Sequence, residues 1–261
     1  MSEKDPSPGP LTRYFDVLEL ISSFSGALTL GDVSSVLGLP KTTAHRLLKG
    51  LVRSNLAKEG DGGRTYQLGE RVTRLLHASA EDGWLASLAG PHLRALSDAT
   101  SEACFLARLV GSHVFVAVSE APDMKWIQHV AEGLEMPINA AASGKAIMAY
   151  QSKALIAEAL SQDLPKPTML AHTSRRWIEK ELASVREQGY ATCVGEIYEG
   201  SAAIACPIIL PGGSVLYSVA ISGPQDRVMD KKMLQRLQIL RDTAEALASA
   251  LSLGASIKSR V

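Results

Sequence analysis

The chain has 261 residues, enough for two domains with separate cores, and its 46% hydrophobic and 21% charged residues are typical of a soluble globular protein. It carries 27 basic and 27 acidic residues, so the total charge does not indicate a polyanionic partner and any such signal must be local. No apolar run approaches the roughly 18 residues of a membrane span, and the polar, proline-rich segment 1–10 is expected to be a disordered lead-in without a secretion signal.

The cysteines do not predict a disulfide framework or a zinc site. Cys104, Cys193 and Cys206 stand far apart, are odd in number and form no CxxC pair. We expect small buried thiols in a protein of the reducing cytoplasm, with no metal and no cofactor.

The first part of the chain predicts three helices. Apolar residues at helical spacing indicate a helix over 13–25. Thr29 is then a good N-cap, with Asp32 three residues on in a variant of the capping box, so a short second helix follows. Gly38 stands where a left-handed residue ends such a helix, and a third helix is predicted over 40–54, opened by its proline.

The predicted third helix has two different faces. Its core side carries Ala44, Leu47, Leu48, Leu51 and Val52, and its other side carries Lys41, Thr42, Thr43, His45, Arg46, Lys49 and Arg53. A short helix, a tight glycine turn and a helix with a basic face are the layout of a helix-turn-helix, whose second helix enters the DNA major groove. We expect Thr42 and Thr43 near base edges or phosphates, and Arg46 and Lys49 further along the groove.

A hairpin follows at the position of a wing. Short strands over 56–59 and 64–68 flank a Gly/Asp turn, with Arg64 near the tip. Residues 40–75 hold eight Lys/Arg against three acids, which is the local patch that phosphate neutralisation needs. The alternative is a solvated helix face beside an unrelated hairpin, but order, spacing and charge together favour double-stranded operator DNA as a partner.

The second part predicts a separate domain. A linker helix over 70–80 is expected to end near Gly83, and a further helix covers 84–100. Strands are predicted over 103–109, 113–119 and 126–132, then helices over 143–149, 152–160 and up to 188, strands over 191–196, 203–209 and 214–222, and a last helix over 231–251. This order indicates an α/β (α+β) fold with a mainly antiparallel sheet. The predicted domains are 11–69, the linker 70–82, a sensor domain 83–255 and a tail 256–261.

The strand over 214–222 carries a candidate ligand site. Large apolar side chains alternate with small ones, Leu216 excepted, and small residues on one face leave room above a sheet. Backbone N–H groups at Ser143-Gly144, which open a helix, favour an anion such as a carboxylate. The candidate effector-binding residues are Ser143, Gly144, Cys193, Glu196, Ala203, Ser218, Ala220 and Ser222, with Ala205 as a further floor residue. The alternative is a core that is merely small-sided.

Enzyme motifs are incomplete. The run NAAASGKA over 139–146 lacks the first glycine and the final Ser/Thr of a phosphate-binding P-loop. No GxSxG or HExxH occurs, and no histidine lies near Cys193 and Glu196 in the sequence. We predict no catalytic residues; a small-molecule-binding α/β enzyme with an accessory DNA-binding domain is the alternative.

Four stretches of the chain resemble the IclR family of bacterial transcription regulators. They are 28–69 (LTLGDVSSVLGLPKTTAHRLLKGLVRSNLAKEGDGGRTYQLG), AASGKAIMAY over 141–150, VREQGYA over 185–191 and VAISGP over 219–224, in the order typical of the family. The resemblance covers almost the whole of 11–253. It implies a winged helix-turn-helix, a GAF-like effector domain, and dimers that often pair into tetramers.

The resemblance also implies a mechanism. Repression is the more common sign in the family, and the candidate effector-binding positions match those that line the effector site in resembling proteins. Ala220 and Ala203 stand where such proteins often have Ser and Cys, so this pocket is expected to be less polar. We expect a small carboxylate or an aromatic acid to control operator affinity, with the linker helix as the lever.

Overall fold

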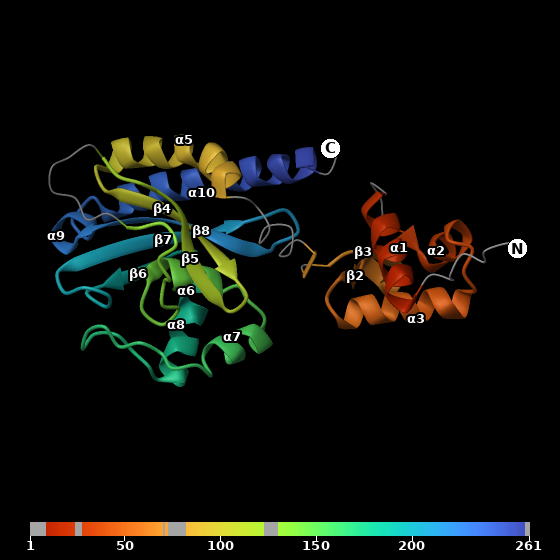
Figure 1. The fold of residues 1–261 in the computed structure, drawn as a ribbon. Helices are drawn as coiled ribbons and strands as arrows, with labels where there is room; N and C mark the ends of the chain where they lie inside the picture. Colours follow the sequence, from red (N-terminus) through yellow and green to blue (C-terminus); the bar gives the residue numbers. More distant parts are fainter. Residues whose placement is uncertain (1–8, 24–27, 70, 73–81, 123–129, 259–261) are drawn as a thin grey trace, which may run out of the picture. The chain divides into compact units, whose positions relative to one another are not determined.

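The computed structural model describes residues 9–23, 28–69, 71–72, 82–122 and 130–258 (Figure 1). The chain divides into two compact units, Met1–Ser79 and Ala80–Val261. The division falls within the predicted linker, most of which lies outside the described residues. So do residues 1–8 of the predicted lead-in 1–10, whose last residue, Pro10, begins a helix. Each unit has its own hydrophobic core.

The first unit packs helices against a small sheet. Its elements are α1 (Pro10–Ser23), β1 (Leu28–Thr29), α2 (Leu30–Val36), α3 (Lys41–Arg53), β2 (Ala57–Glu59), the 3₁₀ turn η1 (Asp61–Gly63) and β3 (Thr65–Leu68). The sheet is antiparallel in the order β1-β3-β2, and the sequence did not predict the two-residue β1. Val17, Val33 and Leu48 are fully buried between the helices, and this core fixes the direction of α3.

Local chemistry sets the start of α2. The Thr29 side chain accepts a hydrogen bond from the Asp32 N–H at 3.2 Å, and the Thr29 N–H donates to the Asp32 carboxylate at 2.8 Å. This is the reciprocal capping box that the sequence predicts, and the bonds to Thr29 lower the pKa of Asp32. Gly38 has φ 61°, so the left-handed turn between α2 and α3 is also as predicted.

A glycine in the middle of α3 has a packing reason. A Cβ at Gly50 would lie 2.8 Å from the Tyr14 hydroxyl of α1. Glycine weakens a helix interior by roughly 0.5–1 kcal/mol relative to alanine, and here that weakening is offset by the close approach of α1. The contact holds the core side of α3, and it leaves the opposite face open.

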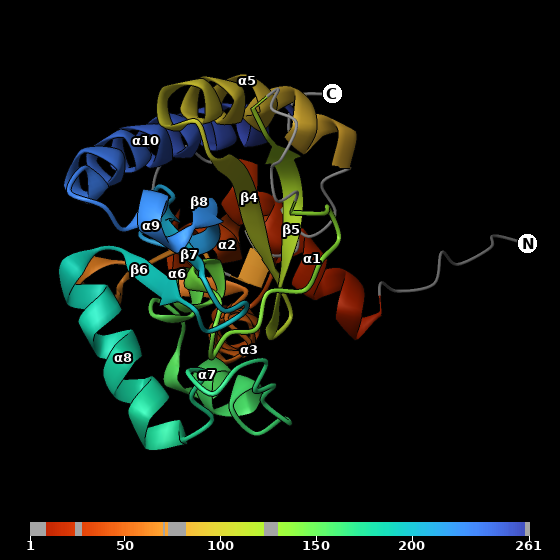
Figure 2. The same ribbon diagram turned by 90° about the vertical axis from the view of Figure 1, so that its left-hand side faces the viewer.

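The second unit is a sheet between helical layers. The strands are β4 (Ala103–Val110), β5 (His113–Glu120), β6 (Ala191–Val194), β7 (Ser201–Ile209) and β8 (Val215–Pro224), antiparallel in the order β5-β4-β8-β7-β6. Its helices are α5 (Asp82–Thr100), α6 (Ala142–Met148), α7 (Lys153–Ala159), α8 (Arg175–Gln188), α9 (Gln225–Val228) and α10 (Met233–Lys258). Figure 2 shows α5 and α10 side by side over one face of the sheet, and α6 and α8 on the other side. The predicted fold class is confirmed.

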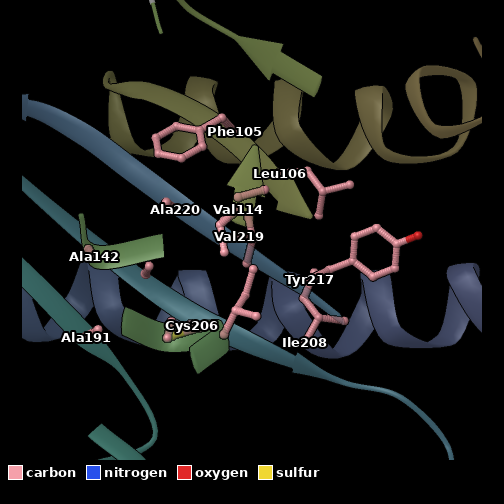
Figure 3. Packing of buried hydrophobic residues seen from close by; sticks show 14 of the residues in the cluster. Phe105, Leu106, Val114, Ala142, Ala191, Cys206, Ile208, Tyr217, Val219 and Ala220 are labelled. Carbon is pink, nitrogen blue, oxygen red and sulfur yellow. The ribbon is translucent and has the colours of Figure 1, made fainter. Parts of the chain in front are cut away.

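The two faces of β8 differ as the alternation predicts. Tyr217 and Val219 belong to the large-residue face, and Figure 3 shows them packed with Leu106 and Ile208. Ser218 and Ala220 belong to the other face, where the Ser218 hydroxyl donates to the Ser143 carbonyl of α6 at 3.2 Å. The small residues therefore let α6 approach the sheet closely, and all seven residues of α6 are buried.

Several predicted boundaries are wrong. Gly83 lies inside α5 rather than before it, because a glycine in the first turn does not prevent the helix from forming. Of the predicted strand 126–132, residues 126–129 lie outside the described part, and Val130 and Ala131 are not in a strand. Instead, residues 133–136 exchange backbone hydrogen bonds with β5 after the turn at Gly133 (φ 78°).

Two more ends differ. The strand predicted over 191–196 stops at Val194, because Gly195 has φ 67° and turns the chain away. The last helix continues to Lys258, so the first residues of the predicted tail are helical. The short α9 was not predicted at all.

Candidate functional site

The outward face of α3 is basic and polar. Lys41, Thr42, His45, Arg46 and Arg53 are exposed, and Thr43 and Lys49 are half-buried. Ala44, Leu47 and Leu51 on the other side of the same helix are buried. The helix thus separates its two faces as its sequence predicts, and every candidate DNA-binding residue of α3 except the two half-buried ones lies open to solvent.

Lys49 has a partner within the unit. Its ammonium donates to Glu59 Oε1 of β2 at 2.8 Å, and this bond raises the pKa of Lys49. The pair links α3 to the hairpin, so it orients the two candidate DNA-contacting elements relative to each other. Lys49 keeps 45% of its side chain exposed, which leaves N–H groups for a phosphate.

The hairpin tip carries Arg64. Gly62 and Gly63 have φ 81° and 68°, a conformation that favours glycine, and exposed Arg64 follows them directly. Two further exposed cations of the unit, Lys58 and Arg71, were counted in the basic patch but not assigned as site residues. Arg71 donates to the Ser54 carbonyl at 3.4 Å, at the end of α3. Only the charge count could have indicated these two residues.

A cavity of about 320 Å³ lies in the second unit. Its lining residues are Phe105, Val130, Leu134, Glu135, Met136, Pro137, Ala141, Ala142, Ser143, Pro167, Cys193, Ile197, Tyr198, Ser201, Ala202, Ala203 and Ser222. The strand register explains its floor, because Cys193 pairs with Ala203, Ala203 with Ser222, and Ser222 with Ala103. Small side chains thus form a row across four neighbouring strands.

Four of the candidate effector-binding residues line this cavity, namely Ser143, Cys193, Ala203 and Ser222. The hydroxyl of Ser143 is buried and has no hydrogen-bond partner among the described residues. A second cavity of about 450 Å³ shares Tyr198, Ser201 and Ser222 with the first. Most of the remaining lining comes from residues 130–142, up to the start of α6, and from 197–202, which lead into β7, and the sequence did not predict these parts.

The other four candidates do not line the cavity. Ser218 and Ala220 are fully buried where α6 packs on the sheet, so no space remains above them. A Cβ at Gly144 would lie 2.9 Å from the Pro137 carbonyl and the Ile138 Cα, so this glycine serves a close backbone contact. Glu196 faces a buried ion cluster instead.

That cluster is centred on Lys145 of α6, which is 0% exposed. Its ammonium lies 2.7 Å from Glu181 Oε1, 2.6 Å from Glu196 Oε2 and 3.1 Å from the Thr192 carbonyl oxygen. Burial raises the pKa of Glu196, although Lys145 opposes the shift. The sequence places this lysine in the incomplete phosphate-binding motif over 139–146, whereas the structure gives it an internal role.

Features of an enzyme are weak at this site. Burial raises the pKa of the Cys193 thiol, which is the reverse of what activates a cysteine nucleophile. Among the described residues, no group of three or more His, Cys, Asp or Glu side chains is placed to hold a metal ion. Within the same part of the chain, no helix is both long and apolar enough to cross a membrane.

Two family models match the chain. The model of the IclR helix-turn-helix domain matches residues 10–60, and the model of the C-terminal domain of the bacterial transcriptional regulator IclR matches residues 77–249. The chain belongs to the IclR family of bacterial transcriptional regulators. The predicted resemblance is thereby confirmed, and the basic face of α3 lies within the matched helix-turn-helix domain of this IclR-family regulator.

Relatives and solved structures agree with the family. The HTH-type transcriptional repressor AllR of Salmonella paratyphi A is 27% identical over 246 residues, which cover 93% of this chain and 90% of that protein. An IclR-type regulator from Silicibacter sp. TM1040 has a TM-score of 0.62 at 24% identity, covering 94% of this chain and 96% of that one. An IclR homologue from Microbacterium hydrocarbonoxydans, solved with 4-hydroxybenzoate, has a TM-score of 0.59 at 24% identity, covering 92% and 98%.

Proposed function

We propose that this IclR-family regulator is a cytoplasmic homodimeric repressor whose operator affinity is set by a small organic or aromatic acid bound in the second unit. The observation that carries the proposal is the pairing of two features in one chain. One is the exposed basic face of α3, and the other is a largely apolar cavity of about 320 Å³ in a separate unit. A cavity of this size holds a ligand of about one aromatic ring with its substituents.

The DNA-binding residues that we propose are Lys41, Thr42, Thr43, His45, Arg46, Lys49, Arg53 and Arg64. A single recognition helix reads only a few base pairs, so two copies of the chain are needed for a specific site. The two half-sites would lie about one helical turn, roughly 34 Å, apart. Pairing of dimers into a tetramer is compatible with this arrangement. The curated relative AllR is named as a repressor, which supports the sign of regulation.

The effector site that we propose is the cavity over Cys193, Ala203 and Ser222. None of the described residues that line it is Lys or Arg, so a carboxylate there would depend on uncharged donors. The Ser143 and Ser222 hydroxyls and the N–H groups of the first turn of α6 are such donors. The 4-hydroxybenzoate bound by a structural neighbour is an acid of this kind. No step in this function requires a cofactor or a catalytic residue.

Two linked experiments test the proposal. The full-length protein is titrated against the DNA upstream of its own gene in a gel-shift assay, with an unrelated fragment of equal length as control. A thermal-shift screen of organic and aromatic acids, with 4-hydroxybenzoate included, then identifies compounds that raise the melting temperature, and each hit is added to the gel-shift assay. Equal affinity for both DNA fragments would contradict the proposed operator binding. Hits that leave operator affinity unchanged would contradict the proposed control by an acid.

A further inference from the structure

The buried ammonium of Lys145 lies behind the wall of the cavity, on the far side of α6. Ser143 of the same helix lines the cavity, and residues two positions apart project from opposite sides of a helix. Lys145 is therefore directed away from the ligand space, toward α8 and β6. It belongs to the layer between α6 and these two elements, and it is not among the residues that line the cavity.

All three N–H groups of the Lys145 ammonium have partners from other elements. Glu181 comes from α8, Thr192 from β6, and Glu196 from the segment that leaves β6. The Glu181 and Glu196 side chains are only 20% and 12% exposed. Such a buried ion cluster is weak evidence for stability, because apolar residues of similar volume stabilise a core as well or better. Its geometry is more informative than its energy.

The cluster holds one segment of the cavity wall, the β6 exit segment, which we define as residues 193–197. Cys193 and Ile197, its two ends, line the cavity, while Glu196 between them bonds to Lys145. Glu196 also accepts a hydrogen bond from the Val194 N–H at 3.4 Å, which stabilises the turn at Gly195.

A second set of hydrogen bonds attaches the same segment to the loop that carries Thr168. The Thr168 hydroxyl lies 2.8 Å from the Gly195 carbonyl oxygen and 3.2 Å from that of Glu196, and the preceding Pro167 lines the cavity. The loop that carries Pro167 is therefore attached to the β6 exit segment. Any displacement of Glu196 would move two parts of the cavity lining together.

We propose that Lys145 is the positioning residue of the effector cavity, and that through Glu196 it fixes the β6 exit segment as a wall of defined shape. This inference rests on the proposed function in treating the cavity as an effector site. That Lys145 holds residues 193–197 in place does not depend on that function. A wall that is already ordered gives the effector a preformed site, because no conformational entropy of this segment is lost when the ligand binds. Glu181, which belongs to α8, holds the Lys145 ammonium in place.

The experiment is hydrogen–deuterium exchange on the full-length protein without DNA and without ligand. Four variants are compared with the natural chain. Glu196→Gln keeps the side-chain shape and weakens the bond to Lys145, and Lys145→Met removes the ammonium. The triple variant Lys145→Met, Glu181→Met and Glu196→Met replaces the cluster with apolar chains of similar length. Glu179→Gln, in an exposed pair with Arg175 on α8, is the matched control.

The positioning role predicts a local effect that is separable from stability. Exchange in 193–197 accelerates about tenfold or more in Glu196→Gln and in the triple variant, since the charge-assisted hydrogen bond is weakened in the first and lost in the second. Exchange in the ladder between β7 and β8 does not change. The triple variant recovers the melting temperature that Lys145→Met loses, yet 193–197 stays fast. The control matches the natural chain in every measurement.

The opposite results overturn the proposal. If the triple variant regains slow exchange in 193–197 together with its melting temperature, the cluster is only core packing. If Glu196→Gln leaves 193–197 as slow as in the natural chain, Glu196 does not hold the wall. Exchange needs neither operator nor effector, so these outcomes are distinct from a failure of the proposed function, which a gel-shift assay on the natural chain reveals.

Discussion

Arg46 is an exposed cation in the middle of the predicted recognition face. It is exposed, while its neighbour Leu47 packs in the core, and it forms no ion pair with another described residue. Its guanidinium is therefore available for bidentate contact with a guanine edge or a phosphate, in contrast to the ammonium of Lys49, which Glu59 binds.

We expect Arg46→Ala to weaken operator binding by about 1–3 kcal/mol per contact, without unfolding the first unit. Removal of an exposed side chain leaves no cavity in the core. The measurement is a fluorescence-anisotropy titration with operator DNA, beside a circular-dichroism melt. Arg13→Ala on α1 is the matched control and retains the affinity of the natural chain. Unchanged affinity in Arg46→Ala would remove α3 from the recognition role.

Ser222 is the residue at which the cavity floor is most easily filled. It lies between Ala103 and Ala203 in neighbouring strands, and it lines both cavities. A leucine there would project into the space above this row of small side chains. Ser222→Leu should therefore abolish the response of operator binding to an effector identified by the acid screen, while Ser222→Ala retains it. A normal response in the leucine variant would place the ligand site elsewhere.

Strand alternation is why part of this floor could be predicted from the sequence. A period of two correctly assigned Ser222 to a small-residue face, and Ala203 and Cys193 to neighbouring strands. The same rule could not show that Ala220 and Ser218 of that face are covered by α6, because the position of a helix over a sheet depends on contacts distant in sequence. The loops that bring Met136 and Tyr198 to the cavity have no periodicity to read.

At the scale of elements, α2 depends on one side chain at its start. The Thr29 hydroxyl satisfies the Asp32 N–H, and a helix of seven residues has little other capacity to hold its own end. Thr29→Ala should destabilise the first unit by about 1 kcal/mol. Native-state hydrogen exchange of α2 amides measures this, and Ser22→Ala, whose hydroxyl bonds to a carbonyl within α1, serves as the control. Equal exchange in the two variants would show that packing alone sets this end.

The elements that were predicted well are those with strong local signals. Capping residues, a left-handed glycine and a stripe of apolar side chains define α2 and α3 within one or two residues. The errors lie where local chemistry permits several outcomes. Gly195 could continue a strand or turn, and its turn is held in part by distant partners, because Lys145 donates to Glu196 and Thr168 donates to the Gly195 carbonyl. The last helix continues past 251 to Lys258, and the glycine at position 254 does not end it.

At the scale of the whole molecule, the total charge is zero, but the two units present different charges to their proposed ligands. The excess of five positive charges over residues 40–75 belongs to the first unit, whereas the proposed effector cavity has no Lys or Arg among its described lining residues. The two proposed ligands should therefore respond differently to ionic strength. DNA binding releases counterions from the phosphates, but binding of a small acid to uncharged donors does not.

We predict that the logarithm of operator affinity falls linearly with the logarithm of salt concentration, with a slope of about −0.9 for each phosphate neutralised. Arg64→Gln at the hairpin tip should make the slope shallower by about one unit per protomer if this residue contacts a phosphate. Affinity for an acid identified in the screen should change little over the same range of salt. Anisotropy titrations at several salt concentrations and calorimetry of the acid supply the two slopes. A flat slope for DNA would show that the basic face does not contact phosphates, and a steep slope for the acid would show that an unidentified cation receives its carboxylate.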